Sequence, residues 1–166
     1  MENYIVINGK KAELTEDQLK ALGIEVPKAS VFDRREKGEW YYFINTRGEV
    51  ESTHETGYPW DNDVYNIANY CTDETLMKQR VLHETLNRLL WRFSMMNGGD
   101  KIDWEDSDTY KYAIYYDCST REFCVKYFYF SKYSSVCFYS KEVAERAVNE
   151  VIKPFIAAHP DFDFTL

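Results

Sequence analysis

The chain has 166 residues, of which 45% are hydrophobic and 17% aromatic, and it carries a formal net charge of −8. This length and hydrophobic content predict one folded domain with a buried core and exclude an intrinsically disordered chain. The negative charge disfavours nucleic acid and anionic membranes as direct partners and favours a protein with a basic surface.

The N-terminus has no charged and apolar targeting segment, and no apolar run is long enough to cross a membrane. The four cysteines, at positions 71, 118, 124 and 137, form no C-x-x-C pair. We therefore expect reduced thiols and a cytoplasmic location.

The first 24 residues predict a β-hairpin followed by a short helix. Strands over residues 3–7 and 10–14 flank Asn8-Gly9, a strong hairpin turn signal. Thr15 and Gln18 have the spacing of a helix capping box. We assign residues 1–24 to this N-terminal unit, 25–38 to a linker, and 39–166 to the main domain.

The main domain begins with a second predicted hairpin, whose strands are residues 40–44 and 49–54. Residues 57–63 are predicted to form a loop, and residues 65–71 a short extended segment. Thr72 is the expected N-cap of a long helix over 73–96, which Asn97-Gly98-Gly99 ends. The apolar residues of this helix recur at helical spacing and predict a core-facing stripe: Leu82, Leu86, Leu89, Leu90 and Phe93.

The C-terminal part predicts three strands, over residues 110–116, 122–130 and 136–139, and a final helix capped by Ser140. Pro154 lies within that helix and is expected to kink it. The buried positions expected of the helix are Ala144, Ala147, Val148, Val151 and Phe155. The fold class predicted from all these elements is α+β, with an antiparallel sheet of hairpins packed against two main helices.

Common catalytic and cofactor motifs are absent from the sequence. The three histidines, at positions 54, 83 and 159, are scattered, and no serine lies in a G-x-S-x-G context. The cysteines and histidines lack zinc-ligand spacing, Gly98-Gly99 is not followed by a phosphate-binding G-K-[ST], and residues 100–108 do not follow a calcium-loop pattern. We expect a protein that is not an enzyme and uses no metal or cofactor.

Two groups of acidic residues surround tryptophans and are the candidate partner-binding site. Tryptophan supplies contact area in protein interfaces, while carboxylates steer a basic partner. An alternative is that these are solvated loops whose tryptophans pack into the core. The candidate residues are Trp60, Asp61, Asp63, Asp100, Asp103, Trp104, Glu105, Asp106 and Asp108.

The predicted C-terminal strands place many aromatic residues on one face. Such a face binds single-stranded nucleic acid in some proteins by base stacking. Few basic residues accompany it here, so core packing against the helices is the favoured interpretation. The face comprises Tyr110, Tyr112, Ile114 and Tyr116 on one strand and Phe123, Val125, Tyr127 and Tyr129 on the next.

Several segments between residues 38 and 158 resemble a group of small uncharacterised proteins from phages and integrated elements of Firmicutes. They include Trp40–Val50, similar to a "YYYID-x-x-G-x-V" hairpin, Asn66–Thr72, Ile102-Asp103-Trp104 and Cys137–Glu145. Cys71 and Met77 depart from the pattern of the group. The resemblance implies a phage accessory protein that binds host machinery, for example an anti-CRISPR inhibitor of a defence nuclease.

The functional hypothesis is therefore a non-enzymatic phage protein that binds and inhibits a basic, nucleic-acid-handling host protein through an acidic, aromatic surface. Two alternatives remain open. One is a single-stranded nucleic-acid-binding module that uses the aromatic face. The other is a metal-dependent nuclease or other hydrolase, whose carboxylates would converge from distant segments of the chain.

Overall fold

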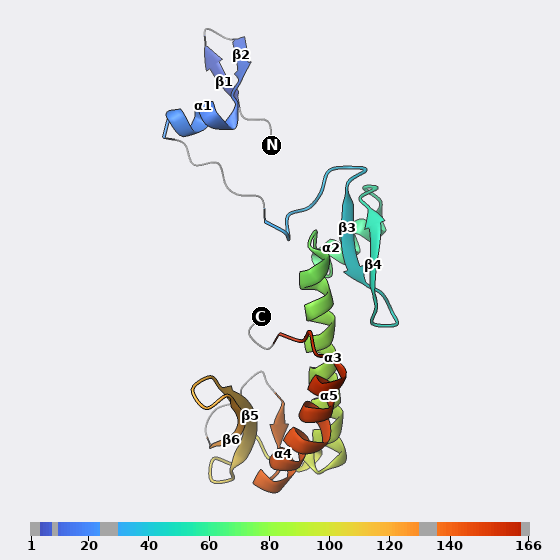
Figure 1. The fold of residues 1–166 in the computed structure, drawn as a ribbon, viewed down its shortest axis with the longest axis vertical. Helices are drawn as coiled ribbons and strands as arrows, with labels where there is room; N and C mark the ends of the chain where they lie inside the picture. Colours follow the sequence, from blue (N-terminus) through green and yellow to red (C-terminus); the bar gives the residue numbers. More distant parts are fainter. Residues whose placement is uncertain (1–3, 8–9, 24–29, 130–135, 164–166) are drawn as a thin grey trace.

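The computed structural model describes residues 4–7, 10–23, 30–129 and 136–163, and within these ranges the chain has an α+β fold, as predicted (Figure 1). Its strands form three separate antiparallel sheets: β1 with β2, β3 with β4, and β5 between β6 and β7. The predicted hairpins are thus present, but they do not join into one sheet.

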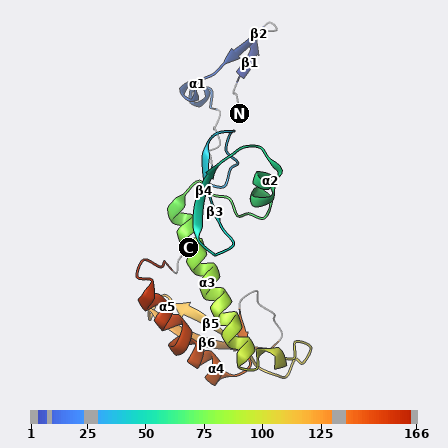
Figure 2. The same cartoon turned by 90° about the vertical axis from the view of Figure 1, so that its right-hand side faces the viewer.

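The N-terminal unit contains the predicted hairpin and helix. β1 (Tyr4–Ile7) pairs with β2 (Lys10–Glu13), and α1 (Glu16–Ala21) follows; the predicted turn at 8–9 lies outside the described residues. The capping box is confirmed, because the Gln18 amide donates to the Thr15 side chain and the Thr15 amide donates to the Gln18 side chain. Figures 1 and 2 show these three elements lying apart from the others.

The second hairpin, β3 (Trp40–Ile44) and β4 (Val50–His54), is confirmed. The predicted loop over 57–63 is wrong, because α2 (Pro59–Asn66) begins at Pro59. Of the predicted extended segment over 65–71, residues 65–66 are helical, and its last residue, Cys71, pairs with Tyr42 in an isolated antiparallel bridge. Pro59 suits the first turn of a helix, where no N–H donor is needed. Tyr41, Val64 and Tyr70 form a small core between α2 and the hairpin, and the Tyr41 and Tyr70 rings stack at 3.9 Å.

The described part of the predicted linker, residues 30–38, is fastened to this first core. The Thr72 amide donates to the Val31 carbonyl, and the Gly38 amide donates to the Glu55 carbonyl. The Arg35 amide donates to the Tyr70 hydroxyl at 2.9 Å. Residues 30–38 are therefore part of the packed structure, while residues 25–29 of the predicted linker lie outside the described residues.

The long helix α3 (Glu74–Met96) joins the first core to a second one. Asp73, rather than the predicted Thr72, is its N-cap, since the Asp73 carboxylate accepts from the Leu76 amide at 3.0 Å. The predicted apolar stripe is confirmed in the second core. The helix ends where predicted, with Asn97 as C-cap and Gly98 at φ 89°, and a short helix η1 (Gly99–Lys101) follows.

The second core lies between α3, the three-stranded sheet and the C-terminal helices (Figure 2). The strands are β5 (Lys111–Asp117), β6 (Glu122–Phe128) and β7 (Cys137–Phe138), and residue 130 of the predicted second strand lies outside the described residues. Tyr112, Ile114, Phe123 and Val125 pack into this core, which confirms the packing interpretation for that part of the aromatic face.

Ser140 caps α4 (Lys141–Ala147) as predicted, and the chain continues through the π-helical segment η2 (Val148–Ile152) into α5 (Lys153–Ala158). Pro154 falls in the first turn of α5. A π-helical turn stands directly before Pro154, where a kink was predicted, so the regular α-helical hydrogen-bond pattern is interrupted at the proline. The buried residues of these helices include Ala144, Ala147, Val148 and Phe155.

Candidate interaction surface

The predicted partner-binding residues lie at two places on the structure. Trp60, Asp61 and Asp63 belong to α2, beside the first turn of α3, whereas residues 100–108 follow the last turn of α3 (Figure 1). A helix of 23 residues is about 35 Å long. The two groups therefore cannot form one continuous patch.

Asp61 is buried and serves the fold. Its side chain is 1% exposed and accepts hydrogen bonds from the Tyr41 hydroxyl at 2.7 Å, from the Thr56 amide at 3.0 Å and from the Tyr58 amide at 3.2 Å. The Thr56 hydroxyl also donates to it. Asp61 thus ties α2 to β3 and contributes no surface, which leaves only Trp60 and Asp63 of this group to contact a partner.

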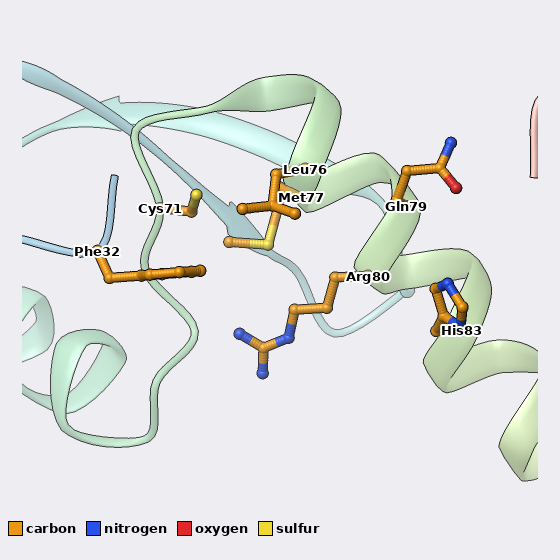
Figure 3. A pocket seen from close by; sticks show the side chains of 7 residues that line it. All are labelled: Phe32, Cys71, Leu76, Met77, Gln79, Arg80 and His83. Atoms are coloured by element: carbon orange, nitrogen blue, oxygen red, sulfur yellow. The ribbon is translucent and has the colours of Figure 1, made fainter. Parts of the chain in front are cut away.

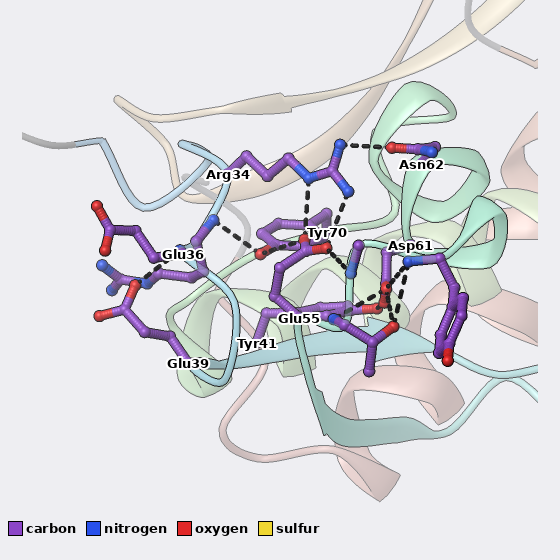
Figure 4. Close-up of polar contacts among 12 residues, drawn as sticks. Arg34, Glu36, Glu39, Tyr41, Glu55, Asp61, Asn62 and Tyr70 are labelled. Atoms are coloured by element: carbon purple, nitrogen blue, oxygen red, sulfur yellow. Dashed lines mark hydrogen bonds and ion pairs between the residues drawn. The ribbon is translucent and has the colours of Figure 1, made fainter. Parts of the chain in front are cut away.

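A second set of polar contacts lies next to Asp61 (Figure 4). The Arg34 guanidinium donates to both Glu55 carboxylate oxygens, at 2.9 and 2.8 Å, and the Tyr70 hydroxyl donates to Glu55 at 3.4 Å. Among the described residues, no buried side-chain nitrogen or oxygen lacks a hydrogen-bond partner. Because these groups are paired with one another, the network acts as a structural clamp, which holds residues 30–38 to Glu55 and Tyr70.

The clamp shifts the pKa of its acidic groups. Burial raises the pKa of Asp61, but the hydrogen bonds from Thr56, Tyr41 and the backbone outweigh it and lower this pKa to about 2. The hydrogen bond from Arg34 lowers the pKa of Glu55. Burial and the hydrogen bond to Asp61 raise the pKa of Tyr41 far above its usual range.

These shifts predict an acid-dependent loss of stability. A carboxyl whose pKa is lowered by folding stabilises the fold above its unfolded pKa of about 4, and this contribution is lost as the pH falls towards 2. Asp61→Asn removes the titrating group, so the stability gap between wild type and this variant is expected to shrink by about 2 kcal/mol between pH 6 and 2. Urea unfolding at a series of pH values measures this stability difference between wild type and Asp61→Asn. A difference that does not change with pH would contradict the lowered pKa of Asp61.

Trp60 and Asp63 remain on the surface of α2. The Trp60 ring is 47% exposed and packs edge-on against Phe43, with centroids 5.0 Å apart, and the Asp63 side chain is exposed. Part of the tryptophan is thus core, as the alternative interpretation expected, and part is accessible. One tryptophan edge with one carboxylate forms a small surface.

The acidic group after α3 folds into an ordered loop. The Asp103 carboxylate accepts from the Glu105 and Asp106 amides at 2.9 and 3.2 Å, and the Asp106 carboxylate accepts from the Asp108 amide at 2.7 Å. The hydrogen bond from Thr109 lowers the pKa of Asp106. Asp103 and Asp106 therefore shape the loop, as aspartates do in turns.

The other loop residues face solvent. Trp104 is 40% exposed, and the side chains of Asp100, Glu105 and Asp108 are exposed. Lys111, at the start of β5, donates to the carbonyl of Asp106 and fixes the loop to the sheet. The loop therefore presents carboxylates and one tryptophan on a backbone that is held in place.

Four tyrosines meet where this loop enters the sheet. Tyr110 lies 5.0 Å from Tyr127 and 4.6 Å from Tyr129 between ring centroids, and Tyr127 lies 5.9 Å from Tyr129. Tyr112 is the fourth, 6.3 Å from Tyr110. Tyr110 and Tyr127 are 45% and 56% exposed, so this end of the aromatic face extends beyond the core.

We define the acid–tyrosine surface as Trp104, Glu105, Asp108, Tyr110, Tyr127 and Tyr129. The sequence analysis identified its acidic part but assigned the tyrosines to the core. The strand register could have indicated their exposure, since Tyr110 and Tyr129 lie just outside the paired residues Lys111 and Phe128. The sequence does not indicate how much of the sheet α4 covers.

A pocket of ≈ 250 Å³ lies between Phe32 and the first turns of α3 (Figure 3). Its floor is apolar, and the polar groups at its rim are engaged within the chain. Gln79 donates to the Asp161 carbonyl at 2.7 Å, His83 is hydrogen bonded to the Asp163 carbonyl at 2.7 Å, and Arg80 pairs with Glu84. The pocket therefore offers mainly apolar contact.

The histidines and cysteines are the remaining residues that could take part in chemistry, and they either pack against other side chains or lie apart from one another. His54 contacts Trp40, His83 contacts Phe162 and His159 contacts Phe155, with ring centroids 4.4 to 4.6 Å apart. All four cysteines are free, and Cys71 and Cys137 are buried. Within the described parts of the chain, no three His, Cys, Asp or Glu residues converge as a metal site would require, and no helix could span a membrane.

The comparisons with known proteins give no match: no family model, no curated protein and no solved structure is similar to this chain. The resemblance to phage proteins rests on the sequence segments alone.

Proposed function

We propose that the protein is a binding module for a protein with a basic surface, and that the acid–tyrosine surface makes the contact. The main observation behind this proposal is that exposed carboxylates and exposed aromatic rings occur together, on the loop after α3 and on the adjoining ends of β5 and β6. Aromatic side chains supply most of the energy in protein interfaces, and carboxylates speed and orient the encounter with a basic partner.

Preorganisation of the loop supports the same proposal. A flexible acidic loop would lose conformational entropy on binding, whereas this loop is already held by Asp103, Asp106 and Lys111. The overall charge of −8 adds long-range attraction to a basic partner. Partners of this kind include proteins whose basic surface handles nucleic acid, and the resemblance to phage proteins makes a host protein of this class our specific expectation.

Nucleic acid itself fits the surface less well. The exposed tyrosines could stack on bases, but Asp108, two residues before Tyr110, is exposed and repels phosphates, and Glu105 adds negative charge to the same loop. The rest of the aromatic face packs in the core. For the metal-dependent alternative, the described residues supply no ligand group on which to build a mechanism.

Affinity capture with paired variants tests the proposal. Glu105→Lys/Asp108→Lys reverses two exposed charges of the surface without removing the loop-forming Asp103 and Asp106, and should abolish capture of a basic, nucleic-acid-handling protein from a Firmicutes lysate. Proteins captured on each bait are identified and quantified by mass spectrometry.

The matched control is Glu122→Lys/Asp161→Lys, which makes the same change of net charge at exposed positions outside the surface. It should capture the same partner as wild type. Asp63→Lys is a third bait, which reports on the small surface at α2. Capture lost with Asp63→Lys and kept with the loop variant would move the binding site to α2, and equal capture by all baits would contradict the proposal.

A further inference from the structure

The tyrosine cluster differs from the rest of the proposed surface because it carries no charge. The hydrogen bond between the Tyr129 and Tyr110 hydroxyls, together with burial, raises the pKa of Tyr129 to about 12. The Tyr129 ring is therefore protonated at neutral pH and keeps the electron-rich face of a neutral phenol. With centroids 4.6 to 5.9 Å apart, the three outer rings touch each other. Tyr127 stands edge-on to both Tyr110 and Tyr129, with interplanar angles of 78° and 84°, so the three rings form a close cluster, which we call the platform, rather than a cage with room for a cation inside.

Carboxylates border this platform. Asp108 precedes Tyr110 by two residues, so their Cα atoms are at most about 7 Å apart, and its side chain is exposed. The basic residues nearest in the sheet, Lys111 and Lys126, alternate with Tyr112 and Tyr127 and so point to the opposite face. Among the described residues of the sheet, a cation on the platform therefore has Asp108 near its edge and no lysine on the same face.

Arginine is the side chain that this arrangement suits best. Its guanidinium is planar, weakly hydrated and able to stack on a ring while its N–H groups donate to a carboxylate beside it. The lysine ammonium is a compact, strongly hydrated charge. It cannot stack on a ring and donate to a carboxylate in the same plane. We propose that the acid–tyrosine surface is selective for arginine over lysine in its partner, an inference that rests on the proposed function and specifies the partner's chemistry.

Two labelled peptides of equal length and charge test this selectivity, one of alternating glycine and arginine and one of alternating glycine and lysine. Binding to the full chain is measured by fluorescence anisotropy at low ionic strength. The arginine peptide should bind about 5- to 10-fold more tightly than the lysine peptide. Tyr110→Leu/Tyr127→Leu should reduce this ratio to about 1, because it weakens binding of the arginine peptide more than binding of the lysine peptide.

Tyr110→Phe/Tyr127→Phe is the matched control, because it keeps the rings and should keep the ratio. Far-UV circular dichroism confirms that each variant is folded. Equal affinities for both peptides, with binding that Glu105→Lys/Asp108→Lys abolishes, would overturn the arginine selectivity and leave the proposed function standing. Retention of the ratio in the leucine variant would also overturn it, and absence of binding to either peptide would overturn both proposals.

Discussion

Asp61→Ala is expected to lower the free energy of unfolding by about 3 kcal/mol. The substitution removes the acceptor of the Tyr41 hydroxyl and of the Thr56 and Tyr58 amides. Each buried donor that loses its partner costs about 1 to 3 kcal/mol, reduced where water can enter. Urea unfolding followed by tryptophan fluorescence measures the change, and Trp60, next to Asp61, reports on this part of the fold.

Asp63→Ala provides the matched control for this substitution. It removes the same carboxylate two residues along α2, but from an exposed position, and should change stability by less than about 0.5 kcal/mol. Equal unfolding midpoints for the two variants would show that Asp61 does not hold α2 to the hairpin.

Phe138→Ala is expected to cost about 4 kcal/mol, the largest effect of any substitution considered for the second core. The Phe138 ring is 1% exposed and packs with Ala144 and Ala147 of α4. Truncation of a buried phenylalanine removes its apolar burial and leaves a cavity that the surrounding helices fill only in part. Thermal and urea unfolding measure the loss.

Tyr139→Ala is the neighbouring control, since this side chain is 48% exposed and should contribute much less. If Phe138→Ala were no more destabilising than Tyr139→Ala, the second core would not be organised around β7 as described.

The two core substitutions together test how α3 couples the two cores. α3 contributes Met77, which is buried near its start, and Leu86, which is buried in the second core. If the helix unfolds as one unit, both variants should shift a single cooperative transition. Two separate transitions, each sensitive to one substitution, would show that the cores unfold independently.

Local signals in the sequence predicted most elements correctly. Hydrophobic periodicity and capping residues predicted both ends of α3 to within one residue and the Ser140 cap of α4, because these signals act over a few neighbouring positions. The failure at α2 has a specific cause. Its apolar residues are few, and it is held to the hairpin by Asp61, whose partner Tyr41 lies 20 residues away in the sequence.

The candidate site was predictable only in part for the same reason. The acidic residues around Trp104 are visible in the sequence, but their division into loop-forming Asp103 and Asp106 and exposed Glu105 and Asp108 depends on backbone geometry. The exposure of Tyr110 and Tyr127 depends on how far the helices extend over the sheet. Arg34, Glu55 and Tyr70 meet across three segments, and no local pattern marks them as a clamp.

The most direct test of the binding proposal is the dissociation constant of the purified partner for three forms of the protein. Glu105→Lys/Asp108→Lys should raise the Kd at least about 10-fold relative to wild type, as expected for the loss of two interfacial charges. Glu122→Lys/Asp161→Lys should leave it within about 2-fold, because long-range attraction is screened by salt. Equal Kd values for the two double variants would contradict the claim that the acid–tyrosine surface binds the partner.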